Sequence, residues 1–412
     1  MRLLEEYQKS LTPKTVEQLQ EENEALYREH PELRPFVKET FQAPQFDEEE
    51  TKKSMVDQFM GDKLHLTNLD ENPTVNFWFG LEEEDYQKIL PEGYPTLSHL
   101  SRSCKTLKEV DCTHAYSLMW TQHCSQLLED LMERKNSNFL RSKSPNGAGG
   151  LILNGIKGVG KTATLAEMVM WARKNGWIVV YVDGRDLTEK GYIEPNKNDR
   201  NLFDQPNQAV KLCKDQLSAH SEILSKLHLK GKVPESIVEA VKVTNETTLA
   251  DLLQFGASNA AQATEIFEEY RMQLNSVKEY PVLLAVDSYD RFHIPSQFTD
   301  RLSLSYQPKL IETNRLVLCR LFSDFDNHGL INGTFMGAFT NGKPKIDWLK
   351  KNGHQYCFPL SPWNLTELSS TMEFWKKTDF LSEDSTNKSI YQYYLTLSSG
   401  IGSEAFRLAK PL

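Results

Sequence analysis

The sequence predicts an α/β domain built on a parallel sheet, and two observations carry that prediction. Residues 151–162 read Leu-Ile-Leu-Asn-Gly-Ile-Lys-Gly-Val-Gly-Lys-Thr, an apolar strand that runs into the pattern Gly-x-x-x-x-Gly-Lys-Thr and then into a helical stretch. Further along the chain, apolar strands alternate with long helical stretches, as they do in parallel α/β domains. We therefore expect a P-loop nucleotide-binding domain at residues 85–388.

The glycine-rich loop predicts a phosphate site at the start of the helix that follows it. Its glycines let the backbone curl so that N–H groups face a β-phosphate at the positive end of that helix. We expect Lys161 to bridge the β- and γ-phosphates and the Thr162 hydroxyl to ligate Mg²⁺. The expected nucleotide-binding residues are Gly155, Lys157, Gly158, Val159, Gly160, Lys161, Thr162 and Ala163.

A second part of the site is expected at the end of a later strand. Beyond the loop the sequence predicts a strand at 177–182, helical stretches at 208–229 and 249–276, and strands at 281–287, 316–322 and 356–360. The strand at 281–287 reads Pro-Val-Leu-Leu-Ala-Val-Asp, the form of a Walker B strand. A buried strand that ends in a carboxylate can hold Mg²⁺ through water beside a P-loop. We therefore predict Asp287 as a metal residue together with Thr162.

The strand expected at 316–322 would be the extra one that separates additional-strand P-loop proteins from other classes. It ends in Ser323 and Asp324, so a polar residue there is a candidate sensor of the γ-phosphate, or an ordinary turn residue. After the last strand, Asn364 is placed to cap a helix at 365–377. A final helical segment, within residues 389–412, would form a small lid.

Composition and charge limit the other possibilities. With 412 residues and 39% hydrophobic content, the chain can bury one large core or two ordinary ones. No apolar run approaches the ~20 residues of a membrane-spanning helix. Residues 1–100 hold 22 Asp and Glu against 10 Lys and Arg, whereas the whole chain has a net charge of −10, so the remainder is close to neutral. We interpret residues 1–84 as an acidic helical extension that wraps a neighbouring protein.

Three other patterns are interpreted as incidental. Cys112, His114, His123 and Cys124 lie along one helical stretch at 115–132, which favours buried thiols and surface imidazoles over a zinc site. The Asn-Lys-x-Asp string at 196–199 matches the guanine-reading string of Ras-like GTPases, and Asp-x-x-Gly at 326–329 matches their switch string. They occur in the wrong order, and the first lies in a polar loop, so a Ras-type GTPase is disfavoured.

Several segments together resemble the death-associated protein 3 family. They are the P-loop, 177–183, the Phe-Asp-Gln-Pro string at 203–206, 281–287, the Pro-Glu-Gly turn at 91–93, 359–364 and 397–401. The resemblance covers about 85–410 and implies an AAA-like (additional-strand) fold with GTP or GDP and Mg²⁺ bound. It also implies a structural role in the mitochondrial ribosomal small subunit in the matrix, with other small-subunit proteins as partners, limited rRNA contact and no membrane. The acidic opening Met-Arg-Leu-Leu-Glu-Glu differs from a matrix-targeting peptide, so the numbering starts at a processed end, the signal is internal, or the compartment differs.

Hydrolysis is expected to be slow or absent. Fast AAA-type ATPases place a glutamate directly after the Walker B acid, whereas here no carboxylate follows Asp287 until Asp290. One alternative is a stand-alone AAA-like or signal-transduction ATPase, with Asp290 or Glu312 as the base and Arg291 or Arg301 as the trans arginine. Another is a nucleotide-gated adaptor with no ribosomal role. Phosphate-binding residues do not read the base, so ATP stays open beside GTP and GDP.

Overall fold

The structure is a computed structural model, and the part of the chain that it describes lies in one compact unit (Asp47–Ile346 with Tyr356–Leu412). The described residues are 73, 75–80, 90–91, 117–140, 149–299, 309–324, 328–340, 357–377, 381 and 388–409. Most of the acidic extension expected at 1–84 therefore lies outside the described residues. Among the described helices, none has the length and apolar character that a membrane crossing requires.

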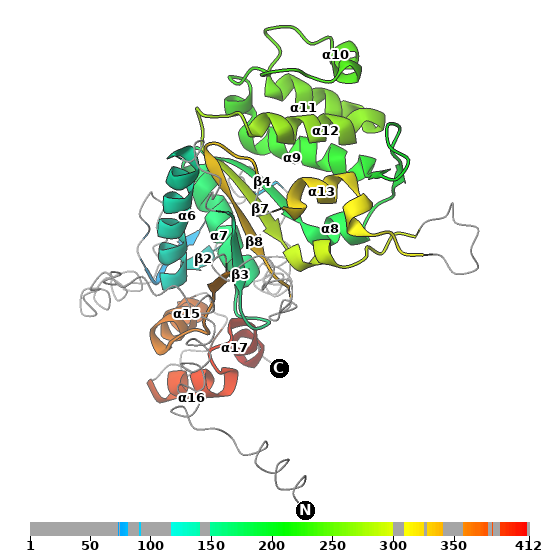
Figure 1. Ribbon diagram of the computed structural model, residues 1–412. Coiled ribbons are helices and arrows are strands. Elements are labelled where there is room, and N and C mark those ends of the chain that lie inside the picture. Colours follow the sequence, from blue (N-terminus) through cyan, green and yellow to red (C-terminus); the bar gives the residue numbers. More distant parts are fainter. Residues whose placement is uncertain are drawn as a thin grey trace, which may run out of the picture. The chain divides into compact units, whose positions relative to one another are not determined.

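A five-stranded parallel sheet forms the centre of this unit (Figure 1). Its strands, in spatial order, are β4 (Ile178–Asp183), β7 (Val282–Asp287), β8 (Gly333–Ala338), β3 (Leu151–Asn154) and β9 (Cys357–Pro359). The strand β8 lies between the strand that precedes the P-loop and the strand that ends in Asp287. This order confirms the AAA-like, additional-strand fold and the strands expected at 177–182, 281–287 and 356–360.

The identity of the extra strand was predicted wrongly. Residues 316–322 are not a strand: most of them belong to helix α13 (Val317–Ser323), which follows a 3₁₀ turn, η3 (Thr313–Arg315). Leu318, Cys319 and Phe322 are buried at helical spacing, so the apolar run is the inner face of a short helix. The extra strand is β8, whose sequence Gly-Thr-Phe-Met-Gly-Ala has low intrinsic strand preference.

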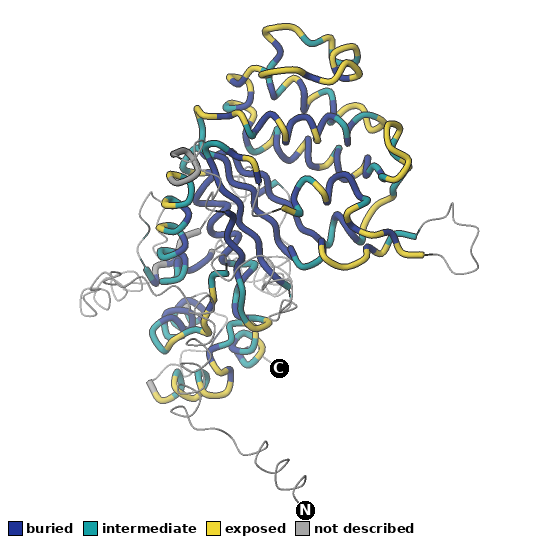
Figure 2. Tube along the Cα trace, viewed as in Figure 1, coloured by how far each residue is buried: buried dark blue, intermediate teal, exposed yellow. Residues whose placement is uncertain are grey.

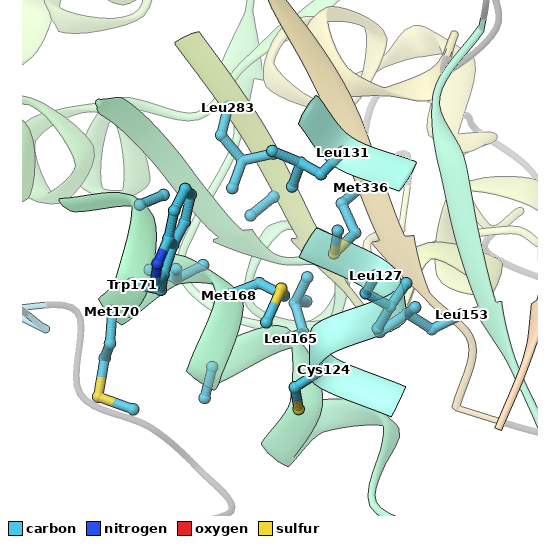
Figure 3. Close-up of a cluster of buried hydrophobic side chains, with 14 of the residues drawn as sticks. Cys124, Leu127, Leu131, Leu153, Leu165, Met168, Met170, Trp171, Leu283 and Met336 are labelled. Carbon is cyan, nitrogen blue, oxygen red and sulfur yellow. The ribbon is translucent and has the colours of Figure 1, made fainter. Parts of the chain in front are cut away.

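One face of the sheet is covered by the P-loop helix α7 (Lys161–Lys174) and by α6 (Gln122–Leu140) (Figure 1). Figure 2 shows the strands and α7 as almost continuously buried. The core between these two helices and the sheet is drawn in Figure 3, where the labelled side chains are Cys124, Leu127, Leu131, Leu153, Leu165, Met168, Met170, Trp171, Leu283 and Met336. Burial of these side chains fixes α7, and with it the P-loop, on the sheet.

Three helices pack against one another: α9 (Pro206–Leu224), α11 (Leu249–Ser258) and α12 (Ala260–Leu274). Of these, α9 contacts β4, at the edge of the sheet. The buried imidazole of His220 on α9 accepts a hydrogen bond from the Val179 backbone N–H at 3.0 Å, which ties that helix to β4. The helical stretch expected at 249–276 is thus two helices, separated at Asn259. A short helix, α10 (Glu235–Val241), lies between α9 and α11 in sequence.

A second, smaller core joins the C-terminal helices to a two-stranded sheet. The helices are α15 (Leu365–Lys377), α16 (Lys388–Ser398) and α17 (Gly402–Ala409), and the strands are β1 (Phe77–Gly80) and β2 (Ser117–Trp120). The helix expected at 115–132 is therefore wrong in its first part, because residues 117–120 pair antiparallel with β1. The Asn364 cap is confirmed: its side chain accepts a hydrogen bond from the Glu367 backbone N–H at 2.9 Å.

Candidate nucleotide-binding site

The P-loop (Gly155–Thr162) turns sharply between β3 and α7, and its glycines occupy conformations that suit the turn. Gly158 and Gly160 have φ angles of 87° and 108°, in the left-handed region that glycine adopts without a steric penalty. Gly160 forms the N-cap of α7 without any side-chain cap, so the first N–H groups of the helix have no side-chain acceptor. A helix start of this kind binds phosphate through backbone N–H groups.

Lys161 lies folded into the loop. Its ammonium donates hydrogen bonds to the carbonyl oxygens of Gly155 at 2.7 Å and Ile156 at 2.9 Å, and the residue is only 5% exposed. Burial lowers the pKa of Lys161, and the charges of Asp290 and Asp287 act in the opposite direction. The ammonium is thus held at the centre of the loop, where the pattern predicts the contact with β- and γ-phosphates.

The predicted metal residues lie together. The Thr162 hydroxyl donates a hydrogen bond to Asp287 Oδ1 at 3.1 Å, although 125 residues separate the two positions. The Ser288 backbone N–H also donates to Oδ1, at 2.8 Å, whereas the other carboxylate oxygen, Oδ2, is buried and has no hydrogen-bond partner. An unpaired, buried carboxylate oxygen beside a threonine hydroxyl fits the oxygen donors that Mg²⁺ takes.

The environment of Asp287 is strongly perturbed. Burial, followed by the charge of Asp183, raises the pKa of Asp287 to about 6, while the charge of Arg185 acts in the opposite direction. Asp183 ends β4 and is the register partner of Asp287 at the end of β7. A perturbed carboxyl with a charged neighbour in a phosphate-type loop marks a functional-site candidate. In the sequence, Asp183 follows an apolar run as Asp287 does, but its place beside Asp287 depends on the pairing of β4 with β7.

The sequence predicted Ser323 or Asp324 as the γ-phosphate sensor at the end of the extra strand. The extra strand is β8, and the polar residue that follows it is Thr340. Ser323 and Asp324 terminate α13, and the Ser323 carbonyl accepts a hydrogen bond from the Tyr289 hydroxyl. Thr340 follows β8, donates its backbone N–H to Asp290 Oδ1 at 2.7 Å, and has a buried hydroxyl without a hydrogen-bond partner. The sensor prediction failed because the extra strand was assigned to the wrong segment.

The C-terminal helices touch the P-loop directly. The Ser403 backbone N–H, in the first turn of α17, donates to the Gly158 carbonyl at 3.2 Å. The preceding turn is fixed by a hydrogen bond from the Trp363 N–H to the Gly400 carbonyl at 2.7 Å. The first turn of α17 contains an acidic residue, Glu404, and no basic one. This helix therefore contributes backbone contacts to the site and no cation from its first turn.

The remaining predicted binding residues differ in exposure. Lys157 is exposed, Val159 is buried in the main core, and Ala163 is half-buried on α7. All three belong to the loop or to the first turn of α7, but within the described residues no side-chain hydrogen bond gives them a separate role. Whether they bind nucleotide stays a prediction.

The other sequence patterns have structural explanations. The side chain of Asn196 accepts hydrogen bonds from the backbone N–H groups of Asn198 and Asp199, forming an Asx turn in the hairpin between β5 (Glu194–Pro195) and β6 (Phe203–Asp204). Part of the Asp-x-x-Gly string, 326–327, lies outside the described residues. Buried Cys124 donates a hydrogen bond to Glu167 at 2.6 Å, and no cluster of metal-ligating side chains occurs within the described ranges.

Comparisons with known proteins place the chain in a family. The model of the family described as mitochondrial ribosomal death-associated protein 3 matches residues 137–408. The small ribosomal subunit protein mS29 of Bos taurus is 24% identical over 221 residues, which cover 51% of this chain and 49% of that protein. The corresponding Mus musculus protein is 24% identical over 217 residues, covering 51% and 50%. The chain thus spans about half the length of these curated relatives.

Solved structures with some likeness include Drosophila ORC bound to DNA, with a TM-score of 0.31, 15% identity and coverage of 67% of this chain and 53% of that one. Another is Cdc6p from Pyrobaculum aerophilum, with a TM-score of 0.29, 12% identity and coverage of 68% and 58%. TM-scores this low carry no argument about function. The family match covers most of the chain, including the P-loop, β7 and the C-terminal helices. The chain therefore belongs to the mitochondrial ribosomal death-associated protein 3 family.

Proposed function

We propose that this chain is a structural component of the mitochondrial ribosomal small subunit, located in the matrix, that binds a guanine nucleotide with Mg²⁺ through its P-loop. Family membership supports the ribosomal part. The observation that carries the nucleotide part is the hydrogen bond between Thr162 and Asp287, with the second Asp287 oxygen buried and unpaired. This hydrogen bond brings the start of α7, where the phosphates are proposed to bind, beside the end of β7, which carries the second proposed metal residue.

Each residue has a defined task in this proposal. The N–H groups of the P-loop and of the first turn of α7 bind the phosphates, and Lys161 exchanges its two carbonyl acceptors for phosphate oxygens. Thr162 and Asp287 would hold Mg²⁺ through their side-chain oxygens. The metal, when bound, supplies positive charge that offsets the charge of the β- and γ-phosphates.

Hydrolysis would be slow or absent, because no carboxylate directly follows Asp287 and the next one, Asp290, is already engaged. Ser288 occupies the position directly after Asp287, and its backbone is in the left-handed region with φ 53°. Asp290, the next carboxylate, accepts the Thr340 N–H. This hydrogen bond orients the Asp290 carboxylate toward the backbone of Thr340, and no carboxylate stands directly after Asp287. The proposed role of the nucleotide is therefore to stabilise the fold and its docking.

The proposed partners are other small-subunit proteins, with limited contact to rRNA. Residues 101–412 are close to electrically neutral, because the acidity of the chain is concentrated in residues 1–100. A neutral surface gives little of the phosphate-backbone attraction on which extensive RNA binding depends. Protein contacts, including those of the acidic extension, are therefore proposed to dominate assembly.

The test is mass spectrometry of the nucleotide released from native protein, combined with gradient sedimentation of mitochondrial extract. We expect guanine nucleotide in near-stoichiometric amount and migration with small-subunit particles. Release of adenine nucleotide would contradict the guanine assignment and leave the P-loop role intact. A protein that carries nucleotide but sediments alone would favour the adaptor, and turnover of about 1 per second or faster would favour the ATPase.

A further inference from the structure

The start of α8 (Gly184–Glu189), which directly follows β4, lies against the end of β7, where Asp287 is the proposed metal residue. Asp183 and Asp287 are register partners in neighbouring parallel strands, so their side chains project from the same face of the sheet. Gly184 comes so close to the end of β7 that an added Cβ would lie 2.6 Å from the Ser288 carbonyl oxygen and 3.3 Å from that of Asp287. Glycine at this position therefore permits Arg185, the next residue, to lie beside the end of β7.

Arg185 is held by Asp183 in a geometry that leaves part of its guanidinium available. Nη2 donates to Asp183 Oδ2 at 3.0 Å and Nε donates to Oδ1 at 3.3 Å, while the Asp183 side chain is only 5% exposed. The Arg185 side chain is 35% exposed, and its Nη1 has no partner among the described residues. A guanidinium with one engaged edge and free donors is suited to bind a phosphate oxygen without losing its orientation.

The other described arginine near the end of β7 is differently engaged. Arg291, on the 3₁₀ turn η2 (Tyr289–His293), lies 3.2 Å from the carboxylate of Glu189 at the end of α8 (Gly184–Glu189). Arg185 is instead paired with Asp183, the register partner of Asp287, and its charge lowers the pKa of the Asp287 carboxyl. Bound Mg²⁺ would offset the charge of Asp287, so the attraction of Arg185 to that carboxylate would weaken and the guanidinium could bind a phosphate oxygen.

We propose that Arg185 distinguishes a nucleoside triphosphate from a diphosphate at this P-loop by contacting the terminal phosphate from within the same chain. The inference rests on the proposed function, because it requires nucleotide at the loop. Asp183 is the positioning residue: it orients the guanidinium before nucleotide binds. In this proposal Arg185 contacts only the terminal phosphate, whereas Lys161 is assigned to the β- and γ-phosphates.

The experiment compares Arg185→Ala with Arg291→Ala in the full chain with Mg²⁺. Dissociation constants are measured by calorimetry for a non-hydrolysable GTP analogue and for GDP. Because hydrogen bonds to charged groups contribute about 1.5–3 kcal/mol, we expect Arg185→Ala to weaken triphosphate binding roughly 10- to 100-fold and GDP binding less than about 3-fold. Arg291→Ala, the matched control, should change both by less than about 3-fold.

Each other outcome overturns a defined statement. Equal losses for both nucleotides, or no loss, would refute the Arg185 assignment, and a selective triphosphate loss in Arg291→Ala would transfer the role to Arg291. If wild-type protein binds neither nucleotide, the proposed function itself fails. Should Arg185→Ala not fold, Arg185→Lys keeps the charge but not the planar fork, and it should lose about 3- to 10-fold for the triphosphate alone. An unchanged ratio in Arg185→Lys would then refute the assignment.

Discussion

Gly158 is the position where the P-loop and the C-terminal helices depend on each other, and its replacement by alanine tests that contact. The Gly158 φ angle is 87°, and an added Cβ would overlap the Ser403 hydroxyl and lie 3.1 Å from Ile401 Cγ2. Gly160 offers a matched control, because its φ is also positive, at 108°, but an added Cβ would meet nothing within 4 Å. The two substitutions share backbone strain and differ in the steric clash.

The magnitudes follow from this difference. An alanine with positive φ costs roughly 1–2 kcal/mol, a penalty that both variants should show. Overpacking against Ser403 and Ile401 adds typically 1–3 kcal/mol at Gly158 alone. We therefore expect Gly158→Ala to lower the free energy of unfolding by about 2–5 kcal/mol and Gly160→Ala by about 1–2 kcal/mol, both measured by urea denaturation without nucleotide.

A double-mutant cycle identifies the cause. Ser403→Gly removes the hydroxyl that would overlap the new methyl group, so it should recover about 1 kcal/mol or more of the Gly158→Ala loss. It should recover nothing in Gly160→Ala, because that position has no contact with Ser403. Equal losses at both glycines, together with additive behaviour in both cycles, would refute the inference that α17 rests on the P-loop.

Three further outcomes are expected. Lys161→Ala should weaken triphosphate binding by roughly 2–4 kcal/mol in calorimetry, because phosphate oxygens lose a charged donor. Lys174→Ala, at the exposed end of α7, should lose less than about 1 kcal/mol. Burial raises the pKa of Glu167 from 4.5 to about 8, so between these pH values the folded state binds one more proton than the unfolded state, and stability falls as pH rises. Glu167→Gln should remove about 3–5 kcal/mol of that loss, so its melting temperature should exceed that of wild type by more at pH 8 than at pH 5. A gain independent of pH would contradict this assignment. Deletion of residues 1–65 should spare nucleotide binding but reduce co-migration with small-subunit particles in a gradient, and equal co-migration would show that the extension is dispensable for docking.

The parts of the fold that could be predicted are those whose local sequence signal is strong. The P-loop strand, β4, β7 and β9 are each an apolar run bounded by polar or turn residues, and α15 begins after the Asn364 cap as expected. The approach of Asp287 to Thr162 was anticipated because parallel strands bring their carboxyl ends to one edge of the sheet. The metal role of these two residues stays a prediction.

The parts that could not be predicted depend on tertiary contacts. Strand β8 carries glycines at 333 and 337, and an added Cβ at Gly337 would lie 2.8 Å from Ile152 Cδ1, so close packing rather than propensity selects this sequence. The apolar run at 316–322 is compatible with either a buried strand or a buried helix. In the structure most of it forms helix α13, which packs against α12 and α8. Arg185 was missed because its importance comes from the pairing of β4 with β7.

The position of the P-loop between two cores would give the proposed nucleotide a structural role that requires no turnover. Val159 belongs to the main core beneath the sheet, whereas Ala405 on α17 belongs to the smaller C-terminal core, and the Gly158 carbonyl accepts the Ser403 N–H between them. A ligand present at a hundred times its Kd adds about 2.7 kcal/mol to stability if it binds only the folded state. Bound at this loop, that contribution would stabilise the loop on which α17 rests and so support the arrangement of both cores. Rapid hydrolysis would remove the terminal phosphate and its contacts, so a structural role requires slow hydrolysis. Two features of the site agree with this: Asp290 accepts a hydrogen bond from the Thr340 N–H, and no carboxylate directly follows Asp287.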